Sequence, residues 1–267
     1  MADVGTYLYA VAGDGGRRPP GGLTGVGGAP VRVIAEGGLL AYVSTVPLDQ
    51  FGEEPLRRSM EELDWLGETA RAHHGVVAAV AATGPTAPVR LVTVYSGDEQ
   101  VRDLLRRRGA DFAEALSRVT GRNEWGVKVY VDPAAPSAAS GGAGGGTGGE
   151  AGARPGLAYL KRRQASLRDR EAAWRDAVAR GERVHTALLD VAVMGRRHRA
   201  QDPQLSGRDE WMVLNGAYLV DENRGPDFAA LVSRFREQGT DVELSGPWPP
   251  YSFTELTDDQ EARHGAP

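Results

Sequence analysis

The sequence predicts an α+β protein of two domains, each a small, mostly antiparallel sheet packed by helices. Short runs rich in β-branched and aromatic residues, typical of strands, are interspersed with longer runs whose apolar residues recur every three or four positions, typical of helices. Both kinds of run occur on either side of one low-complexity segment. A chain of 267 residues is also longer than one ordinary small domain, so we expect domains at 1–121 and 122–267.

The N-terminal half opens with three predicted strands, at residues 6–11, 31–35 and 39–46. Glu36, Gly37 and Gly38 separate the last two, and this is a hairpin-turn pattern. We therefore expect a hairpin with the first strand as its partner.

One long amphipathic helix is predicted from Glu53 to about Ala81. Its proposed buried face consists of Leu56, Met60, Leu63, Ala70, His74 and Val77. Gly84 and Pro85 end the helix, and residues 89–95 are then predicted to form a buried strand. A second helix is expected at 98–119, because Asp98 and Glu99 suit a helix N-terminus.

The second half begins with a predicted strand at 125–131. Residues 134–155, which are mostly Ala, Gly, Ser and Pro up to residue 153, cannot bury enough apolar surface to form a core, so they are expected to be a flexible insertion. Two helices are predicted next, at 157–180 and 184–199, with a break near Gly181. The first carries a stripe of Leu157, Leu160, Leu167, Trp174 and Val178, interrupted by Gln164 and Glu171.

A strand at 211–220, a helix at 227–238 that begins at Pro226, and a last strand at 242–244 complete the chain. The polar tail after residue 257 is expected to be frayed. This order of strand, helices, strand, helix and strand is similar to a ferredoxin-like split βαβ arrangement, which we predict for the C-terminal domain.

Composition excludes several classes of function. The chain has no cysteine, so a disulfide framework, a thiolate metal site and a cysteine nucleophile are excluded. A formal charge of −5 argues against nucleic acid as a partner. The N-terminus does not have the pattern of a signal peptide, and no apolar run has the length of a membrane span. We therefore expect a cytoplasmic protein that does not bind membranes.

No motif indicates catalysis, a metal or a cofactor. His73 and His74 are adjacent, so on a helix they point in different directions and do not form a metal-binding pair. The glycines at 21–28 are followed by Pro30 and a strand-like run, whereas a phosphate-binding loop needs a helix there. The sequence predicts no enzyme and no cofactor.

Two groups of side chains are candidates for protein binding. The first is basic and includes Arg162 and Arg163, although such clusters are more often a solvated helix face. The second consists of Trp248, Tyr251 and Phe253, which are displayed on a proline-rich backbone. Large rings beside a strand are also frequent core residues, so both interpretations of the aromatic group stay open.

Several runs resemble, in order, those of the gas vesicle protein F/L family. They are TYLYAV, GVGGAPV, NEWGVKVY at 123–130, WMVLNGAYLV and GPWPPYSF at 246–253. The resemblance extends from Thr6 to about Leu256. NEWGVKVY and GPWPPYSF are its most specific parts, because they are rare residue combinations. The insertion at 134–153 is longer than expected for this family.

The resemblance implies an accessory protein of gas vesicle assembly with no enzymatic activity, located in the cytoplasm in association with the vesicles. Its expected partners are the small apolar shell protein and other gas vesicle accessory proteins; no oligomeric state is predicted. Free shell subunits need protection because exposed apolar faces and strand edges aggregate. We hypothesise that the C-terminal sheet accepts a client strand near Trp248, Tyr251 and Phe253. A two-domain adaptor unrelated to gas vesicles is the alternative.

Overall fold

The computed structural model describes residues 3–16, 19, 21–132, 155–200 and 210–254, with the backbone alone for 155–166. The low-complexity insertion, up to residue 154, and the predicted frayed tail after 257 lie outside the described residues. The chain forms two compact units, of which unit 1 contains Met1–Glu124 and Gly246–Pro267 and unit 2 contains Trp125–Ser245. The domain boundary at 121/122 stays a prediction. Residues from Gly246 onward, predicted to be part of the second domain, group with unit 1.

Unit 1 contains a five-stranded sheet with the order β2-β3-β1-β4, in which β5 also pairs with β1. The predicted hairpin is confirmed, since β2 (Arg32–Glu36) and β3 (Leu39–Pro47) are antiparallel and are joined by Gly37 and Gly38. Both glycines have positive φ, as a two-residue hairpin turn requires. β1 (Val4–Gly13) pairs with the other side of β3, with a bulge between Leu8 and Ala10.

The short helix α1 (Leu48–Phe51) follows β3, and the predicted long helix at 53–81 is two helices in the structure, α2 (Glu53–Ser59) and α3 (Leu63–Ala81). The charges on either side of the break suit two helix ends. Arg57 and Arg58 occupy the last turn of α2 and Asp64 the first turn of α3, where each sign matches a helix end. The predicted buried face was wrong in part: Leu63 is 83% exposed, and the buried positions of α3 are Thr69, His73, Val76, Val77 and Val80.

The predicted buried strand at 89–95 was wrong in part. Only its last two residues form a strand, β5 (Val94–Tyr95), the segment is half-buried, and another short strand, β4 (Thr86–Pro88), precedes it; both strands pair antiparallel with β1. Val92 between them has a φ of 57°, which interrupts an extended strand, and its N–H bonds the Tyr7 hydroxyl rather than a neighbouring strand. The predicted helix at 98–119 is two helices, α4 (Asp98–Arg107) and α5 (Gly109–Val119).

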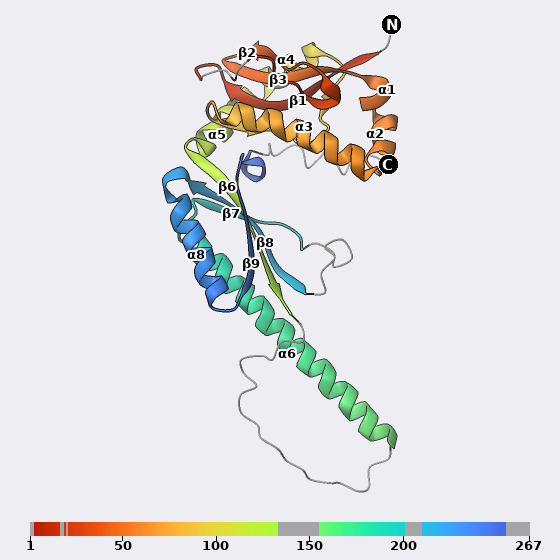
Figure 1. Cartoon of the computed structure of the whole chain (residues 1–267), viewed down its shortest axis with the longest axis vertical. Coiled ribbons are helices and arrows are strands. Elements are labelled where there is room, and N and C mark those ends of the chain that lie inside the picture. The colour runs from red at the N-terminus through yellow and green to blue at the C-terminus, as the bar shows by residue number, and fades with distance from the viewer. Residues whose placement is uncertain (1–2, 17–18, 20, 133–154, 201–209, 255–267) are drawn as a thin grey trace. The chain divides into compact units, whose positions relative to one another are not determined.

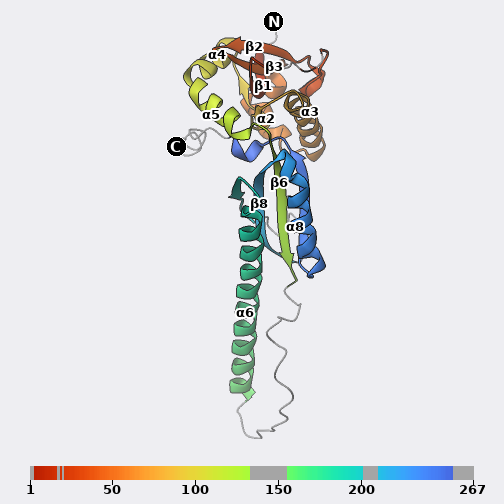
Figure 2. The same cartoon turned by 90° about the vertical axis from the view of Figure 1, so that its left-hand side faces the viewer.

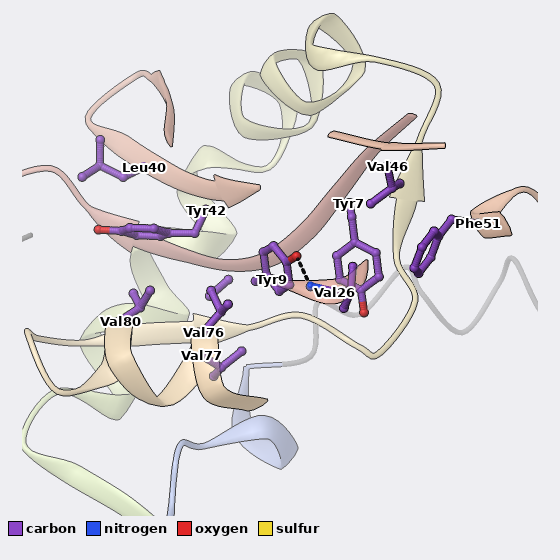
Figure 3. Close-up of a cluster of buried hydrophobic side chains, with 11 residues drawn as sticks. Tyr7, Tyr9, Val26, Leu40, Tyr42, Val46, Phe51, Val76, Val77 and Val80 are labelled. Carbon is purple, nitrogen blue, oxygen red and sulfur yellow. Dashed lines mark hydrogen bonds between the residues drawn. The ribbon is translucent and has the colours of Figure 1, made fainter. Parts of the chain in front are cut away.

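The core of unit 1 lies between the sheet and the helices. Figure 3 shows the part on the α3 side, where Tyr7 and Tyr9 of β1 lie near Val76 and Val77 of α3. The Tyr9 hydroxyl accepts a hydrogen bond from the Val26 N–H at 2.9 Å. A second cluster, with Leu8, Val11, Leu105, Phe112 and Leu116 among its members, lies against α4 and α5. The sheet is therefore buried on both faces, which positions β1 rigidly.

Unit 2 is ferredoxin-like, as predicted. Its elements follow the order β6 (Arg122–Val131), α6 (Pro155–Leu189), β7 (Met194–Arg197), β8 (Trp211–Asp221), α8 (Gly225–Glu237) and β9 (Asp241–Trp248), as Figures 1 and 2 show. The strand order β7-β8-β6-β9 is that of a βαββαβ fold. β6 begins in unit 1 and carries the chain into unit 2, and β9 ends in unit 1 and carries the chain back.

The predicted helix break near Gly181 was wrong. α6 continues through Gly181 to Leu189, and the predicted second helix is replaced beyond that point by β7. A Cβ atom on Gly181 would lie 2.9 Å from the carbonyl oxygen of Val213 in β8. The glycine therefore permits close helix–sheet packing and does not end the helix.

Candidate functional site

The C-terminal segment, Gly246–Thr254, packs on helix α3 in unit 1. The Trp248 ring meets His74 edge-to-face at 5.5 Å, and the Tyr251 ring stacks with His74 at 6.4 Å. Tyr251 also packs against the core cluster that contains Tyr7 and Val77. The proline-rich aromatic run is thus part of the packing of unit 1.

Hydrogen bonds fix this segment at three points. The Glu124 carboxylate accepts bonds from the N–H and the hydroxyl of Ser252, both at 2.7 Å. The Arg118 side chain donates to the Phe253 carbonyl at 3.1 Å, and the Thr254 hydroxyl donates to the Pro88 carbonyl at 3.3 Å. Glu124 and Ser252 belong to NEWGVKVY and GPWPPYSF, so the two most specific runs of the sequence meet here.

The structure separates the predicted protein-binding residues. Phe253 is 3% exposed and Tyr251 is half-buried, so both rings fit the core interpretation. Burial also raises the pKa of the Tyr251 phenol. Trp248 is 44% exposed and is available for contact. Arg162 and Arg163 lie on α6, and their side chains lie outside the described part of the chain.

His73 is a structural residue. Its Nε2 lies 3.1 Å from the Val89 carbonyl oxygen, so Nε2 carries the hydrogen, and its Nδ1 accepts from the Tyr7 hydroxyl at 3.0 Å. The Tyr7 hydroxyl in turn accepts from the Val92 N–H at 2.9 Å. Burial lowers the pKa of His73 to about 4, which keeps the ring neutral at pH 7. Among the described residues, no group of His, Asp or Glu is arranged to hold a metal ion.

The outer edge of β7 is a second candidate surface, which the sequence analysis missed. β7 is a terminal strand of its sheet and all four of its residues are exposed. Leu189, Val193 and Met194, here called the β7 patch, are each 40–42% exposed. Leu189 lies against the strand, because its Cδ2 is 2.6 Å from the position of a Cβ on Gly195.

The register of β7 directs two backbone units to the outside. The His198 N–H donates to the Asn215 carbonyl at 2.7 Å, and Gly195 pairs with Tyr218. Because hydrogen-bonded positions alternate in an antiparallel pair, Met194 and Arg196 bond to β8, whereas Gly195 and Arg197 present N–H and C=O groups to the outer edge. An exposed edge of this kind can accept an extended strand.

No sequence signal separated β7 from the preceding helix. Its four residues, MGRR, have neither alternation nor β-branched residues, and charged residues on an edge strand resemble those of a solvated helix. Of the helices that the structure describes, none combines the length and apolarity needed to cross a membrane.

Comparison with known proteins gives consistent matches over nearly the whole chain. The family model described as "Gas vesicle synthesis protein GvpL/GvpF" matches residues 5–255. Gas vesicle protein L of Streptomyces sp. (strain CB03234) is 42% identical over 253 residues, covering 95% of this chain and 94% of the relative. Gas vesicle protein F of the same strain is 28% identical over 259 residues, covering 94% of this chain and all of the relative.

Solved structures agree in fold. The crystal structure of gas vesicle protein GvpF from Microcystis aeruginosa has a TM-score of 0.64 at 17% identity, covering 94% of this chain and 99% of that chain. GvpF from Anabaena sp. PCC7120 has a TM-score of 0.62 at 18% identity, covering 95% and 97%. The two-sheet α+β architecture is thus shared despite low sequence identity.

Proposed function

The chain belongs to the gas vesicle synthesis protein GvpL/GvpF family, and from this premise we propose that it is a non-enzymatic accessory protein of gas vesicle assembly. Its proposed partners are the small apolar shell protein and other accessory proteins, met in the cytoplasm beside the growing vesicle. The higher identity to the L relative than to the F relative favours an L-type role. Membership in this family replaces the alternative of an adaptor unrelated to gas vesicles.

The observation that carries the proposed contact is the exposed edge of β7. A gas-filled shell needs an apolar inner face, so a free shell subunit exposes apolar surface and strand edges that aggregate. A client strand added to β7 would bond to the outward groups of Gly195 and Arg197 and would cover its apolar side chains on the β7 patch. This proposal specifies the edge of the C-terminal sheet that strand addition uses.

Trp248 is retained in the proposal as a separate contact residue, because its indole is exposed. Tyr251 and Phe253 are assigned to the core of unit 1. Replacing Trp248 by Ala would therefore change partner binding with little effect on stability, whereas replacing Tyr251 would affect stability first.

Strand addition is tested by two substitutions at Gly195. Gly195→Pro removes the outward N–H and places a ring on the outer edge, while the bonds from Met194 and Arg196 to β8 are kept. Gly195→Ala adds the same Cβ, which meets the flexible end of Leu189 at 2.6 Å and the Tyr218 ring at 3.3 Å, but keeps the N–H, so both variants share this crowding and differ in the N–H and the proline ring. In a pull-down of the purified shell protein from the same gene cluster, Gly195→Pro is expected to weaken binding about tenfold relative to Gly195→Ala.

Equal binding by the two variants, with unchanged circular dichroism, would remove β7 from the proposal. Binding of other accessory proteins without any binding of the shell protein would instead assign the chain an adaptor role within gas vesicle assembly.

A further inference from the structure

Strand β2 leaves one edge of the unit 1 sheet open. It is the terminal strand in the order β2-β3-β1-β4, and only its inner edge pairs with β3. The chain before β2 bonds to the start of the outer edge, where the Leu23 carbonyl accepts from the Val31 N–H at 2.9 Å. Val33 is 36% exposed and Ala35 is also exposed. Residues Arg32–Glu36 therefore form an accessible edge, here called the β2 edge.

The register of β2 directs the backbone groups of Val33 and Ala35 outward. Glu36 and Leu39 flank the two-residue turn and form a hydrogen-bonded pair, so every second residue of β2 before Glu36 also bonds to β3. Val33 and Ala35 lie between these positions and present their N–H and C=O groups to the open edge. Among the described residues, none outside the sheet forms a hydrogen bond with these groups.

Opposite charges lie at the two ends of the β2 edge. Arg32 donates two hydrogen bonds to the Asp98 carboxylate, at 2.7 and 2.8 Å, and Glu36 lies 3.4 Å from Arg106. Asp98 and Arg106 both belong to α4, so both charged side chains lie on the α4 face of the strand. Ile34 lies between them on the same face and is 3% exposed.

These positions make the β2 edge complementary to itself in antiparallel orientation. When Ile34 lies opposite Ile34 of a second copy, Arg32 of each copy faces Glu36 of the other, and Val33 faces Ala35. Each of the two Val33–Ala35 pairs would exchange two backbone hydrogen bonds, because both residues direct their groups outward. Opposite charges directly across a ladder are favourable, whereas a parallel arrangement would place like charges side by side.

We propose that the β2 edge pairs antiparallel with the β2 edge of a second copy of this chain, which gives a two-fold symmetric dimer. The pairing keeps the ion pairs to Asp98 and Arg106, so charges alternate in sign across the dimer. Two five-residue strands bury less surface than a standard interface, so we expect a reversible dimer with a dissociation constant on the order of 10 µM. The β2 edge belongs to unit 1 and the β7 edge to unit 2, so separate substitutions test self-association and client binding.

Sedimentation equilibrium of the full chain over about 1 to 300 µM is expected to show a monomer that converts to a dimer. Ala35→Pro removes an outward N–H and places a ring on the edge, while the bonds of its neighbours to β3 are kept. Ala35→Val, the matched control, adds a side chain of similar size but keeps the N–H. The proline variant is expected to dimerise at least about tenfold more weakly than the valine variant.

Charge exchange tests the antiparallel register. Glu36→Arg places cations opposite each other in a dimer of that variant, and Arg32→Glu places carboxylates opposite each other, so each variant alone is expected to stay monomeric. An equimolar mixture of the two is expected to regain the dimer, because every cross-strand pair then joins opposite charges. Circular dichroism checks that each variant is folded, and the comparison of Ala35→Pro with Ala35→Val decides the case if one is not.

A chain that is monomeric at every concentration overturns the proposal. Equal dimerisation of the Ala35→Pro and Ala35→Val variants also overturns it, as does a mixture of folded charge variants that stays monomeric. If the full chain is monomeric and Ala35→Pro captures the purified shell protein more weakly than Ala35→Val does, the occupant is a client strand, and the proposal of a second copy is wrong.

Discussion

At the residue scale, hydrogen bonds among buried side chains of unit 1 support an irregular part of its backbone. The Tyr7 hydroxyl links the Val92 N–H to His73, and His73 reaches the Val89 carbonyl with its other nitrogen. These bonds hold the irregular backbone between β4 and β5, including the left-handed conformation of Val92, which is unfavourable for a β-branched residue. A buried histidine with all its partners satisfied is therefore a packing residue here.

His73 gives the free energy of unfolding a predictable pH dependence. Its pKa is about 4 in the folded protein, mainly because burial disfavours the charged ring, against an ordinary value of 6.5. Between these values the unfolded chain binds more protons, so stability is fully present above about pH 6.5 and is lost as the pH falls through about 4. The loss from this residue is on the order of 3 kcal/mol, measurable by urea unfolding at successive pH values.

His73→Gln is expected to be less stable at pH 7 but to have a flatter profile between pH 6.5 and 4. Imidazole nitrogen shifts from NMR give a direct check, since they report the midpoint and whether Nε2 carries the hydrogen. A midpoint near 6.5 for His73 would contradict this account.

At the element scale, Gly181 decides how closely α6 approaches the sheet. Alanine is favoured over glycine in a helix by about 1 kcal/mol, but a Cβ at this position would lie 2.9 Å from the backbone oxygen and 3.2 Å from Cγ2 of Val213. The Val213 backbone cannot move aside as the end of a side chain can. The steric cost of the added Cβ therefore exceeds the gain in helix propensity from alanine. Gly181→Ala is expected to destabilise the protein by about 1–2 kcal/mol in chemical denaturation.

Gly75→Ala in α3 is the matched comparison, because its added Cβ would meet nothing within 4 Å. This variant should be as stable as the original chain or more stable by up to about 1 kcal/mol. If Gly181→Ala were stabilised by the same amount, close packing of α6 on β8 would not be the reason for the glycine.

Elements whose apolar residues form a clear pattern, or that are bounded by a turn signal, were predictable from the sequence. The β2–β3 hairpin followed from two glycines, α8 from Pro226, and β8 from its apolar run. The continuity of α6 and the existence of β7 were not predictable, since Gly181 is explained only by Val213 and β7 is defined only by its pairing with β8. Contacts between residues far apart in the sequence also limited the prediction of the candidate site. The sequence indicated three aromatic residues, but only the tertiary packing shows that Trp248 is exposed and Phe253 is buried.

At the scale of the whole molecule, unit 2 is an insertion within the sequence of unit 1. The chain leaves unit 1 after Glu124 and returns at Gly246, and the bonds between Glu124 and Ser252 lie where the two segments of unit 1 meet. Cutting the chain before Asn123 therefore removes the C-terminal segment together with unit 2. Loss of partner binding in such a truncation would not identify the unit responsible.

A variant in which Glu124 is joined to Gly246 by a short linker separates the loss of unit 2 from the loss of the C-terminal segment. The ends to be joined are close, because a Cβ on Gly126 would lie 2.6 Å from the Ser245 Oγ, so a linker of about four Gly and Ser residues can replace 125–245. Compared with residues 1–124 alone, the joined variant regains the packing of Tyr251 and the bonds of Ser252 and Thr254. These contacts together contribute about 3 kcal/mol, so its melting temperature should be about 10 °C higher.

The joined variant also tests where the shell protein binds. It contains Trp248 but lacks the β7 edge and α6, so the proposed function predicts a folded protein with little or no affinity in the pull-down. Affinity equal to that of the full chain would place the contact on unit 1. A melting temperature equal to that of residues 1–124 would instead mean that the C-terminal segment adds no stability to unit 1. The two readouts are independent, because the first depends on which surface is present and the second on how the N-terminal core is completed.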